Sequence, residues 1–196
     1  MDFFDSKYRG TPPWDIGRPQ KEFIELVQRG EISGSVLDIG CGTGKHALFF
    51  AGEGYDAWGV DSAPLAIQKA REKADRRGLQ VHFCVLNALA LSMLNRKFDT
   101  TTDSGLFHTQ SDEDRPVFMD NLAAILSPAG KYFMLCFSEL EPAGYGPRRI
   151  TRREIQDSFS DGWSINYIRP AIFESRTRAE GPRAWLSSIS KKRTNN

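Results

Sequence analysis

The sequence contains few cysteines, few histidines and no long hydrophobic run. Its three cysteines, Cys41, Cys84 and Cys136, are odd in number and widely spaced, which predicts reduced thiols and a cytoplasmic location instead of a disulfide framework. No cysteine or histidine pair has the spacing of metal ligands, so no metal site is expected. No segment approaches the roughly 18 apolar residues of a transmembrane helix, and the first residues lack the pattern of a signal peptide. We therefore expect no membrane association.

The charge of the chain is nearly balanced. The 196 residues carry a formal net charge of +1, so no overall field would attract nucleic acid or an anionic membrane. A composition of 40% hydrophobic and 26% charged residues is typical of a globular protein with a buried core. The length predicts one domain over residues 1–196. We expect a monomer or a weak homodimer that acts on a small molecule and has no nucleic-acid partner.

Apolar runs alternate with helical patterns, as in a mostly parallel sheet covered by helices. Strands are predicted at Ser35–Ile39, Ala57–Val60, Val81–Leu86, Phe98–Thr102 and Lys131–Ser138, and helices at Lys45–Ala51, Pro64–Arg77, Asp112–Leu126 and Thr151–Phe159. Two later extended segments, Trp163–Phe173 and Arg183–Ser190, suggest an antiparallel pair at the sheet edge. The expected fold is α/β: a single doubly wound, Rossmann-like domain with a mostly parallel sheet, an antiparallel C-terminal strand and helices on both faces. Residues 31–196 would form its cofactor-binding core and residues 1–30 a covering segment.

Local signals mark where these elements begin and end. Ser62 is expected to cap the helix that starts at Pro64, and Gly78 to end that helix. Thr151 and Glu154 have the spacing of a capping box. The segment Ser-Pro-Ala-Gly at 127–130 is expected to stop the preceding helix and turn the chain into a strand. Two of the three histidines, His46 and His82, fall in a predicted helix and a predicted strand and are expected to be structural.

The segment VLDIGCGTG at 36–44 predicts a strand that leads into a glycine loop and a helix. In such a loop, a ligand approaches the backbone near the positive end of the helix. A phosphate-binding P-loop is excluded, because only three residues separate Gly40 from Gly44. A dinucleotide loop is disfavoured by Lys45, which stands where such a loop has its third Gly or an Ala. It is also disfavoured by Asp38, whose carboxylate would repel a pyrophosphate. Asp38 would instead attract the ammonium group of a cofactor that carries an amino acid.

Asp61 supplies a second anchor, because it ends the predicted second strand at the carboxyl edge of the sheet. A carboxylate there accepts hydrogen bonds from both hydroxyls of a ribose. Its alternative role is to cap the following helix. Asp61 favours an adenosine ligand, but it does not distinguish adenosylmethionine from NAD.

The segment at 36–44 resembles the first motif of class I S-adenosylmethionine-dependent methyltransferases. The segment PWDIGRPQ at 13–20 resembles a motif of the small-molecule group that includes thiopurine, halide/thiol and tellurite-resistance methyltransferases. Two more segments, DSGLFH at 103–108 and GPRR at 146–149, resemble the loops after the fourth and fifth strands of that group. The resemblance covers nearly the whole chain. It implies an enzyme that transfers the methyl group of adenosylmethionine to sulfur, oxygen, nitrogen or a halide of a small molecule, and leaves adenosylhomocysteine.

The resemblance also implies cofactor-binding residues. Asp38 and Gly40 would face the methionine moiety, with Gly42 in the same loop. Asp61 would bind the ribose, with Ser62 beside it, and Asn87 followed by Ala88 would meet the adenine amino group. Trp14 would pack near the sulfonium, and Asp103 and Ser104 would border the methionine end and the transferable methyl group.

Two positions depart from the pattern of that group. Many relatives carry Asp where this chain has Asn87, whose amide oxygen can still accept from the adenine amino group. The Thr-Thr-Thr segment at 100–102 is more polar than the usual fourth strand, although threonine forms strands well. Both departures keep open a non-catalytic adenosylmethionine-binding protein. An NAD-dependent oxidoreductase is the third alternative.

Methyl transfer from a sulfonium mainly requires proximity, orientation and exclusion of water. A hydroxyl or amine acceptor would gain from a general base, for which His108 is the candidate; the alternative is a histidine that faces solvent or caps the next helix. Candidate substrate contacts are Phe4 and Tyr8 in the aromatic N-terminal segment, and Arg18 and Arg149 for an acidic acceptor. Packing on the sheet, or solvation in the case of the arginines, is the alternative for these four.

Overall fold

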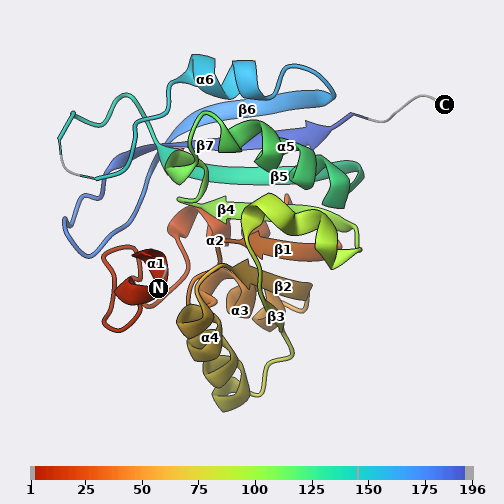
Figure 1. Cartoon of the computed structure of the whole chain (residues 1–196), viewed down its shortest axis with the longest axis vertical. Coiled ribbons are helices and arrows are strands. Elements are labelled where there is room, and N and C mark those ends of the chain that lie inside the picture. The colour runs from red at the N-terminus through yellow and green to blue at the C-terminus, as the bar shows by residue number, and fades with distance from the viewer. Residues whose placement is uncertain (1–2, 145, 193–196) are drawn as a thin grey trace.

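The strands form one seven-stranded sheet in the order β3-β2-β1-β4-β5-β7-β6 (Figure 1). The structure is a computed structural model, and it describes residues 3–144 and 146–192. Five strands run parallel: β1 (Ser35–Ile39), β2 (Asp56–Asp61), β3 (His82–Val85), β4 (Phe98–Ser104) and β5 (Leu126–Phe137). β7 (Arg183–Lys191) pairs antiparallel with β5, and β6 (Trp163–Ile172) pairs antiparallel with β7. The predicted mostly parallel sheet with an antiparallel C-terminal strand is confirmed.

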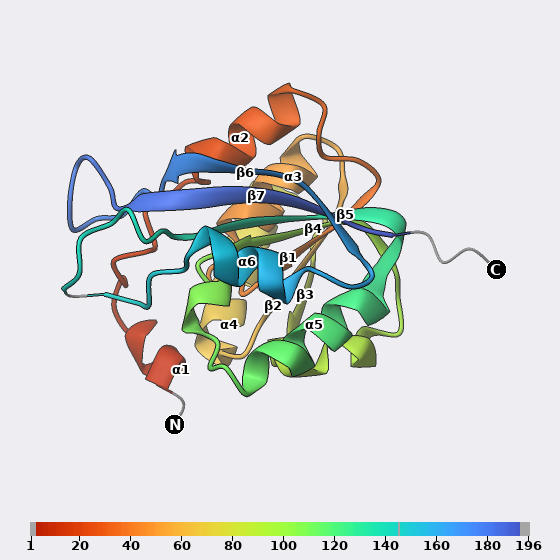
Figure 2. The ribbon, with the colours of Figure 1, turned by 90° about the horizontal axis from the view of Figure 1, so that it is seen from above.

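Helices cover both faces of the sheet (Figure 2). α2 (Lys21–Gln28) and α3 (Lys45–Gly52) lie on one face, where Phe23, Leu26 and Phe50 join a core with Val36 and Phe133 from the strands. The other face carries α5 (Asp114–Ile125), α6 (Arg152–Ser158) and the short 3-10 helix η1 (Ala88–Leu94). α4 (Pro64–Arg77) packs with α3 around Phe83, and α1 (Phe3–Lys7) and the 3-10 helix η2 (Phe107–Thr109) complete the elements named here.

Two of the four local signals act as predicted. Gly78 ends α4 in the left-handed conformation at φ +62°, and Thr151 and Glu154 form a reciprocal capping box at α6. The expected cap at Ser62 is wrong, because Ala63 occupies the N-cap position of α4. The expected stop at 127–130 is also different: β5 begins at Leu126 directly after α5, and a register shift against β4 accommodates the segment.

The polar fourth strand is explained by its neighbours. All three threonines at 100–102 are fully buried. Thr100 Oγ1 donates to the Ser33 carbonyl oxygen at 2.9 Å, and Thr102 Oγ1 donates to Asp38 Oδ1 at 2.9 Å. Two of the three hydroxyls therefore have partners on adjoining segments, whereas Thr101 Oγ1 has no hydrogen-bonding partner among the described residues.

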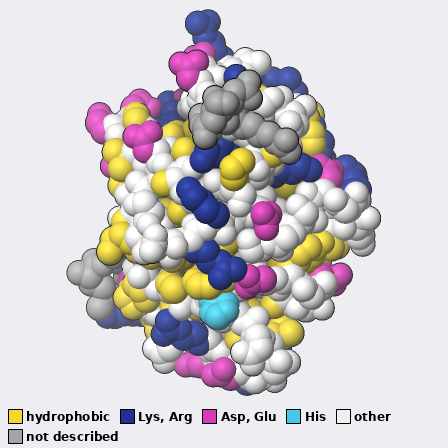
Figure 3. Space-filling model, turned by 90° about the vertical axis from the view of Figure 1, so that its right-hand side faces the viewer, with side chains coloured by type: hydrophobic (Ala, Val, Ile, Leu, Met, Phe, Trp, Pro, Cys, Tyr) yellow, Lys and Arg dark blue, Asp and Glu magenta, His cyan; other side chains and the backbone are white. Residues whose placement is uncertain are grey.

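The N-terminal segment lies across the carboxyl ends of the parallel strands, and we call residues 3–20 the N-terminal strap (Figure 1). Asp5 Oδ1 accepts from the Leu65 backbone N–H at 2.9 Å, and Lys69 Nζ donates to the Tyr8 carbonyl oxygen, so the strap is tied to α4. On the face that Figure 3 shows, basic side chains lie scattered among acidic and hydrophobic ones. No helix within residues 3–144 and 146–192 is long and apolar enough to cross a membrane.

Candidate functional site

The glycine loop connects β1 to α3 in a backbone conformation that requires glycine. Gly40, Gly42 and Gly44 have φ values of +67°, +54° and +78°, in the left-handed region. A Cβ on Gly42 would lie 2.7 Å from the Tyr8 hydroxyl oxygen, and one on Gly44 would lie 2.7 Å from the Phe83 ring. The loop therefore combines a tight turn with close packing. Its backbone lies directly before the N-terminus of α3.

Asp38 lies one residue before the end of β1 and is almost completely buried. Its Oδ1 accepts from Thr102, whereas its Oδ2 has no hydrogen-bonding partner among the described residues. His46 Nδ1 is 3.6 Å from this oxygen. Because His46 Nε2 accepts from the Gln20 backbone N–H at 3.1 Å, a neutral His46 imidazole carries its proton on Nδ1, toward Asp38. A buried carboxylate oxygen with spare acceptor capacity is suited to an ammonium group.

Asp61 ends β2 and joins the glycine loop to α4. Its Oδ2 accepts from the Gly42 backbone N–H at 2.8 Å, and its Oδ1 accepts from the Ala63 backbone N–H at 2.9 Å. A carboxylate oxygen can accept more than one hydrogen bond, so these two bonds do not conflict with a role in binding ribose. Ser62, which follows Asp61 in the chain, is half-buried. The helix-capping alternative and the ribose role are thus compatible in this geometry.

Asn87 and Ala88 follow β3 at the start of η1. Asn87 is exposed, and its Oδ1 accepts from the Leu89 backbone N–H at 2.9 Å, while Ala88 is buried. The amide oxygen that the sequence assigns to adenine therefore also caps η1. Its contact with adenine stays a prediction.

Asp103 points into the protein from the end of β4. Its carboxylate is fully buried and accepts from the Leu106 N–H at 2.6 Å, the Phe107 N–H at 2.9 Å and the Tyr132 hydroxyl at 2.8 Å. Burial raises the pKa of Asp103 to about 7, although these hydrogen bonds oppose the rise. Asp103 shapes the loop after β4, and the next residue, Ser104, is the one that faces the cleft.

A cluster of polar side chains fixes the strap to the glycine loop. Asp15 Oδ1 accepts from Lys45 Nζ at 2.8 Å, and Asp15 Oδ2 accepts from the Thr43 hydroxyl at 2.7 Å. Lys45 Nζ also donates to the Trp14 carbonyl oxygen at 3.2 Å. Burial alone would raise the pKa of Asp15, but the hydrogen bonds from Lys45 and Thr43 outweigh it and lower that pKa to about 2. We call Asp15, Thr43 and Lys45 the strap clasp.

Aromatic residues of the strap form a cover beside the clasp. Trp14 Nε1 donates to the Tyr8 hydroxyl at 3.1 Å, and the rings of Phe4 and Tyr8 each pack edge-on against Trp14 at 6.3 Å. Tyr8 is buried, while Phe4 and Trp14 are half-buried. Tyr8 and Trp14 line the cleft, whereas Phe4 contacts Trp14 and is not part of the lining.

A second connection joins the strap to the segment after β6. Arg18 forms a two-point ion pair with Glu174, at 2.7 and 2.9 Å between nitrogen and oxygen atoms. The Gln20 side chain exchanges hydrogen bonds with the Glu174 backbone, at 2.9 Å to its carbonyl oxygen and 2.8 Å from its N–H. Arg18 lies at the cleft as predicted for a substrate contact, but Glu174 already neutralises its charge.

His108 and Arg149 occupy different surroundings from those expected. His108 is buried, so the solvent-facing alternative is wrong, and Glu113 rather than His108 is the N-cap residue of α5. Burial and the charge of Arg149 lower the pKa of His108 to about 3. Arg149 donates to the Pro147 and Pro142 carbonyl oxygens at 2.6 and 2.7 Å, which organises its own loop outside the cleft lining.

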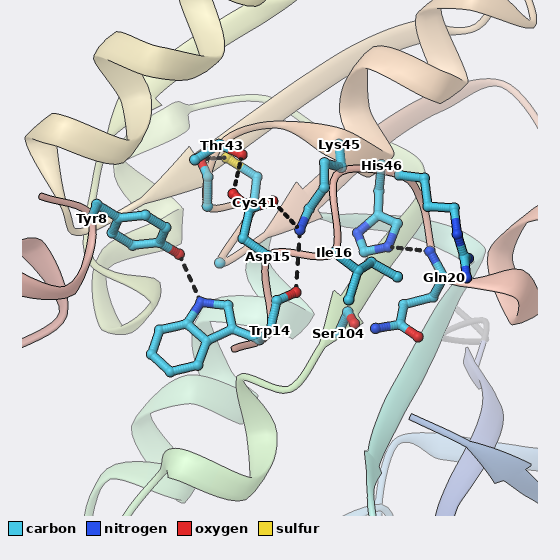
Figure 4. Close-up of a pocket in the computed structure, with 13 residues that line it drawn as sticks. Tyr8, Trp14, Asp15, Ile16, Gln20, Cys41, Thr43, Lys45, His46 and Ser104 are labelled. Carbon is cyan, nitrogen blue, oxygen red and sulfur yellow. Dashed lines mark hydrogen bonds and ion pairs between the residues drawn. The ribbon is translucent and has the colours of Figure 1, made fainter. Parts of the chain in front are cut away.

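The strap and the glycine loop enclose a cleft at the carboxyl ends of the strands (Figure 4). Its volume, including the open mouth, is about 410 Å³. It is lined by Tyr8, Trp14, Asp15, Ile16, Arg18, Gln20, Gly40, Cys41, Gly42, Thr43, Lys45, His46 and Ser104. Six of these were singled out from the sequence as site residues, whereas Asp38, Asp61 and Asp103 stand behind the lining.

Sequence reasoning missed the clasp and His46. Asp15 lies inside the segment at 13–20 that carries the family resemblance, yet no role was assigned to it. Lys45 served only as an argument against a dinucleotide, and its charge directly after the glycine loop was the available signal. His46 was expected to be structural, but it lines the cleft and faces Asp38. The contacts of Asp15 with Lys45 and of His46 with Asp38 join residues from different elements, so no sequence motif marks them.

Comparisons with known proteins agree with this geometry. A family model described as a methyltransferase domain matches residues 36–130. A 2-heptyl-1-hydroxyquinolin-4(1H)-one methyltransferase from Mycobacteroides abscessus is 36% identical over 182 residues, which are 87% of this chain and 80% of that protein. A probable thiol methyltransferase 2 from Arabidopsis thaliana is 26% identical over 149 residues, which are 75% of this chain and 66% of that protein.

Solved structures share the architecture. A protein studied for the conversion of a disulfide bond into a thioacetal group during echinomycin biosynthesis is 34% identical, with a TM-score of 0.89 over 98% of this chain and 93% of that one. TehB from Haemophilus influenzae is 18% identical, with a TM-score of 0.72 over 98% of this chain and 66% of that one, which shows a shared fold. With a glycine loop, an orphaned acidic oxygen and a strand-end carboxylate in the expected places, this chain belongs to the class I S-adenosylmethionine-dependent methyltransferases.

Proposed function

We propose that this methyltransferase binds adenosylmethionine in the cleft between the glycine loop and the N-terminal strap, and transfers its methyl group to a small-molecule acceptor. The cleft is the observation that supports the proposal. Its lining combines two aromatic rings of the strap with a few polar side chains and the backbone of the glycine loop, which is the make-up of a small-molecule site. Two relatives are named for small acceptors, a hydroxyquinolinone and a thiol. The net charge of +1 gives no reason to expect nucleic acid, and we propose a monomer or a weak homodimer.

The residues present fit adenosylmethionine. The unpartnered Oδ2 of Asp38 suits its ammonium group, and the glycine loop provides backbone that a ligand can approach closely. Asp61, anchored by two backbone N–H groups, is held rigidly enough to accept from both ribose hydroxyls. When bound, adenosylmethionine supplies a methyl group activated by its sulfonium.

The chain contributes orientation and exclusion of water. The strap clasp holds Trp14 over the loop, where its ring face can stabilise a cation. Tyr8 and Trp14 are joined by a hydrogen bond and form the apolar side of the cover. Ser104 offers the cleft a hydroxyl from the end of β4. Such an arrangement favours transfer by proximity and desolvation.

Family membership removes the two other functions considered from the sequence. A methyltransferase domain and named methyltransferase relatives identify an enzyme and argue against a non-catalytic binding protein. The same membership argues against an NAD-dependent oxidoreductase, which Asp38 and Lys45 already disfavour.

Calorimetry and a methyl-transfer screen test the proposal. The protein should bind adenosylmethionine and adenosylhomocysteine but not NAD, and Asp61→Ala should weaken both. Labelled methyl groups from adenosylmethionine should then appear on at least one class of thiol, phenol, amine or halide. Binding of NAD alone, or transfer only to nucleic acid or protein, would contradict it.

A further inference from the structure

The hydrogen bonding of His108 fixes which ring nitrogen carries its proton. His108 Nδ1 accepts from the Phe137 backbone N–H at 3.0 Å. An imidazole nitrogen that accepts a hydrogen bond carries no proton, so the neutral ring is protonated on Nε2. The same bond uses the lone pair of Nδ1, which leaves His108 no free basic nitrogen.

The Nε2 atom faces the loop that follows β4. A Cβ on Gly105 would lie 3.3 Å from it and 3.0 Å from the Phe173 ring, at a φ of +87°. Nε2 forms no hydrogen bond with the described residues, and it is not one of the fully buried polar atoms. The small exposed part of His108, 6% of the residue, therefore includes this N–H. Gly105 keeps it uncovered, one residue after Ser104 of the cleft.

Aromatic rings pack against the His108 side chain. The His108 ring centroid is 5.0 Å from that of Phe137 and 5.9 Å from that of Phe173. Arg149 places its guanidinium 5.7 Å from the Phe137 ring centroid on the side of this cluster. Burial and the Arg149 charge both disfavour a protonated ring, so the imidazole stays neutral at physiological pH. A neutral donor among rings, near a cationic group, suits a flat anion.

We propose that His108 binds the methyl acceptor through its Nε2–H, and that the acceptor is an acidic hydroxyl group on a flat ring, bound as its oxyanion. This inference rests on the proposed function. The hydroxyl loses its proton to solvent before transfer. The oxyanion then forms a bond to the methyl carbon while the carbon–sulfur bond breaks and its electron pair stays on sulfur. His108 stabilises the bound anion and accepts no proton, unlike the general base expected from the sequence.

The test uses 4-nitrophenol as the acceptor, because its anion absorbs visible light. It is titrated into the protein saturated with adenosylhomocysteine, over a series of pH values. In the wild-type protein, the pKa of bound 4-nitrophenol should lie below that of the free phenol. An unchanged or raised pKa of the bound phenol, or no binding to the adenosylhomocysteine complex, overturns the proposal.

Two variants separate the two ring nitrogens. His108→Asn keeps an acceptor for Phe137 and removes the Nε2 donor, whereas His108→Gln keeps a donor near the Nε2 position and removes the acceptor. We expect His108→Asn to weaken binding of the phenolate roughly 10- to 100-fold, as for loss of a hydrogen bond to a charged group, and His108→Gln to weaken it less. Equal losses in both variants, or an ascending limb of kcat against pH that His108→Asn abolishes, would show a structural role or a general base instead.

Adenosylhomocysteine affinity distinguishes this proposal from the proposed function. It should be unchanged in both His108 variants, because His108 does not line the cofactor cleft. If wild-type protein fails to bind adenosylhomocysteine, the proposed function fails. If it binds adenosylhomocysteine but not 4-nitrophenolate, only the assignment of His108 and its acceptor fails.

Discussion

Replacing Asp15 with asparagine should release the N-terminal strap from the glycine loop without changing its shape. Asp15 accepts from both Lys45 and Thr43, and an amide oxygen can take only part of that role. The substitution leaves the Lys45 ammonium buried, with 12% of its side chain exposed, and without its counter-charge. The strap covers the cleft, so its release should also weaken the binding of adenosylmethionine.

The size of the effect follows from the pKa of Asp15. That pKa is about 2 in the folded protein against 3.8 for the free side chain. A difference of one in pKa corresponds to about 1.4 kcal/mol, so the ionised carboxylate contributes about 2.5 kcal/mol at neutral pH. Because the folded value is the lower one, this contribution is full above the unfolded pKa and is lost as pH falls through the folded pKa. It is about 1.3 kcal/mol at pH 3.

Urea denaturation of wild type and Asp15→Asn, followed by circular dichroism, measures the difference directly. Hydrogen exchange of residues 8–18 at neutral pH shows whether the strap opens separately from the rest. The control is Asp161→Asn, which changes an exposed carboxylate far along the chain. We expect a loss of about 2 kcal/mol at pH 7 that shrinks by about half at pH 3. A loss that is the same at both pH values, or no greater than that of Asp161→Asn, would refute this account of the clasp.

Three further predictions concern the loop, the ribose site and a buried acid. Gly42→Ala should cost about 1–3 kcal/mol in urea denaturation, because its φ is +54° and its Cβ would meet the Tyr8 hydroxyl, and Tyr8→Phe in the same chain should recover part of that loss. Asp61→Asn should weaken adenosylmethionine binding roughly tenfold or more in calorimetry, because one bond to a charged acceptor is lost; Asp56→Asn at the other end of β2 should not. The pKa of Asp103 is raised from 3.8 to about 7, so its contribution to stability is full below the unfolded pKa and is lost as pH rises through the folded pKa. The urea midpoint should therefore fall between about pH 4 and 7, and a slope that is unchanged in Asp103→Asn would contradict this.

The element pattern could be predicted because it depends on local periodicity and local stops. β1 and α4 have the predicted bounds, and the other strands differ at their ends by a few residues. The start of β5 is the largest difference, because the Ser-Pro-Ala-Gly segment pairs with β4 instead of forming a separate turn. Pairing across a sheet is a tertiary contact, and a turn signal in the sequence does not report it.

The sequence by itself determined the α/β fold class, the glycine loop and the places of Asp38 and Asp61 at the ends of their strands, because spacing along a strand, loop and helix is carried by consecutive residues. Only the tertiary structure decided which groups the ligand can reach. It turned Asp103 inward onto Tyr132, joined Asp15 to Lys45 across 30 positions, and used His108 Nδ1 to bind the Phe137 backbone. Each of these outcomes depends on the burial and direction of a side chain among residues distant in sequence. A hydrogen-bonding partner of that kind leaves no periodicity and no motif in the chain, so the chemistry of His108 was readable only after folding.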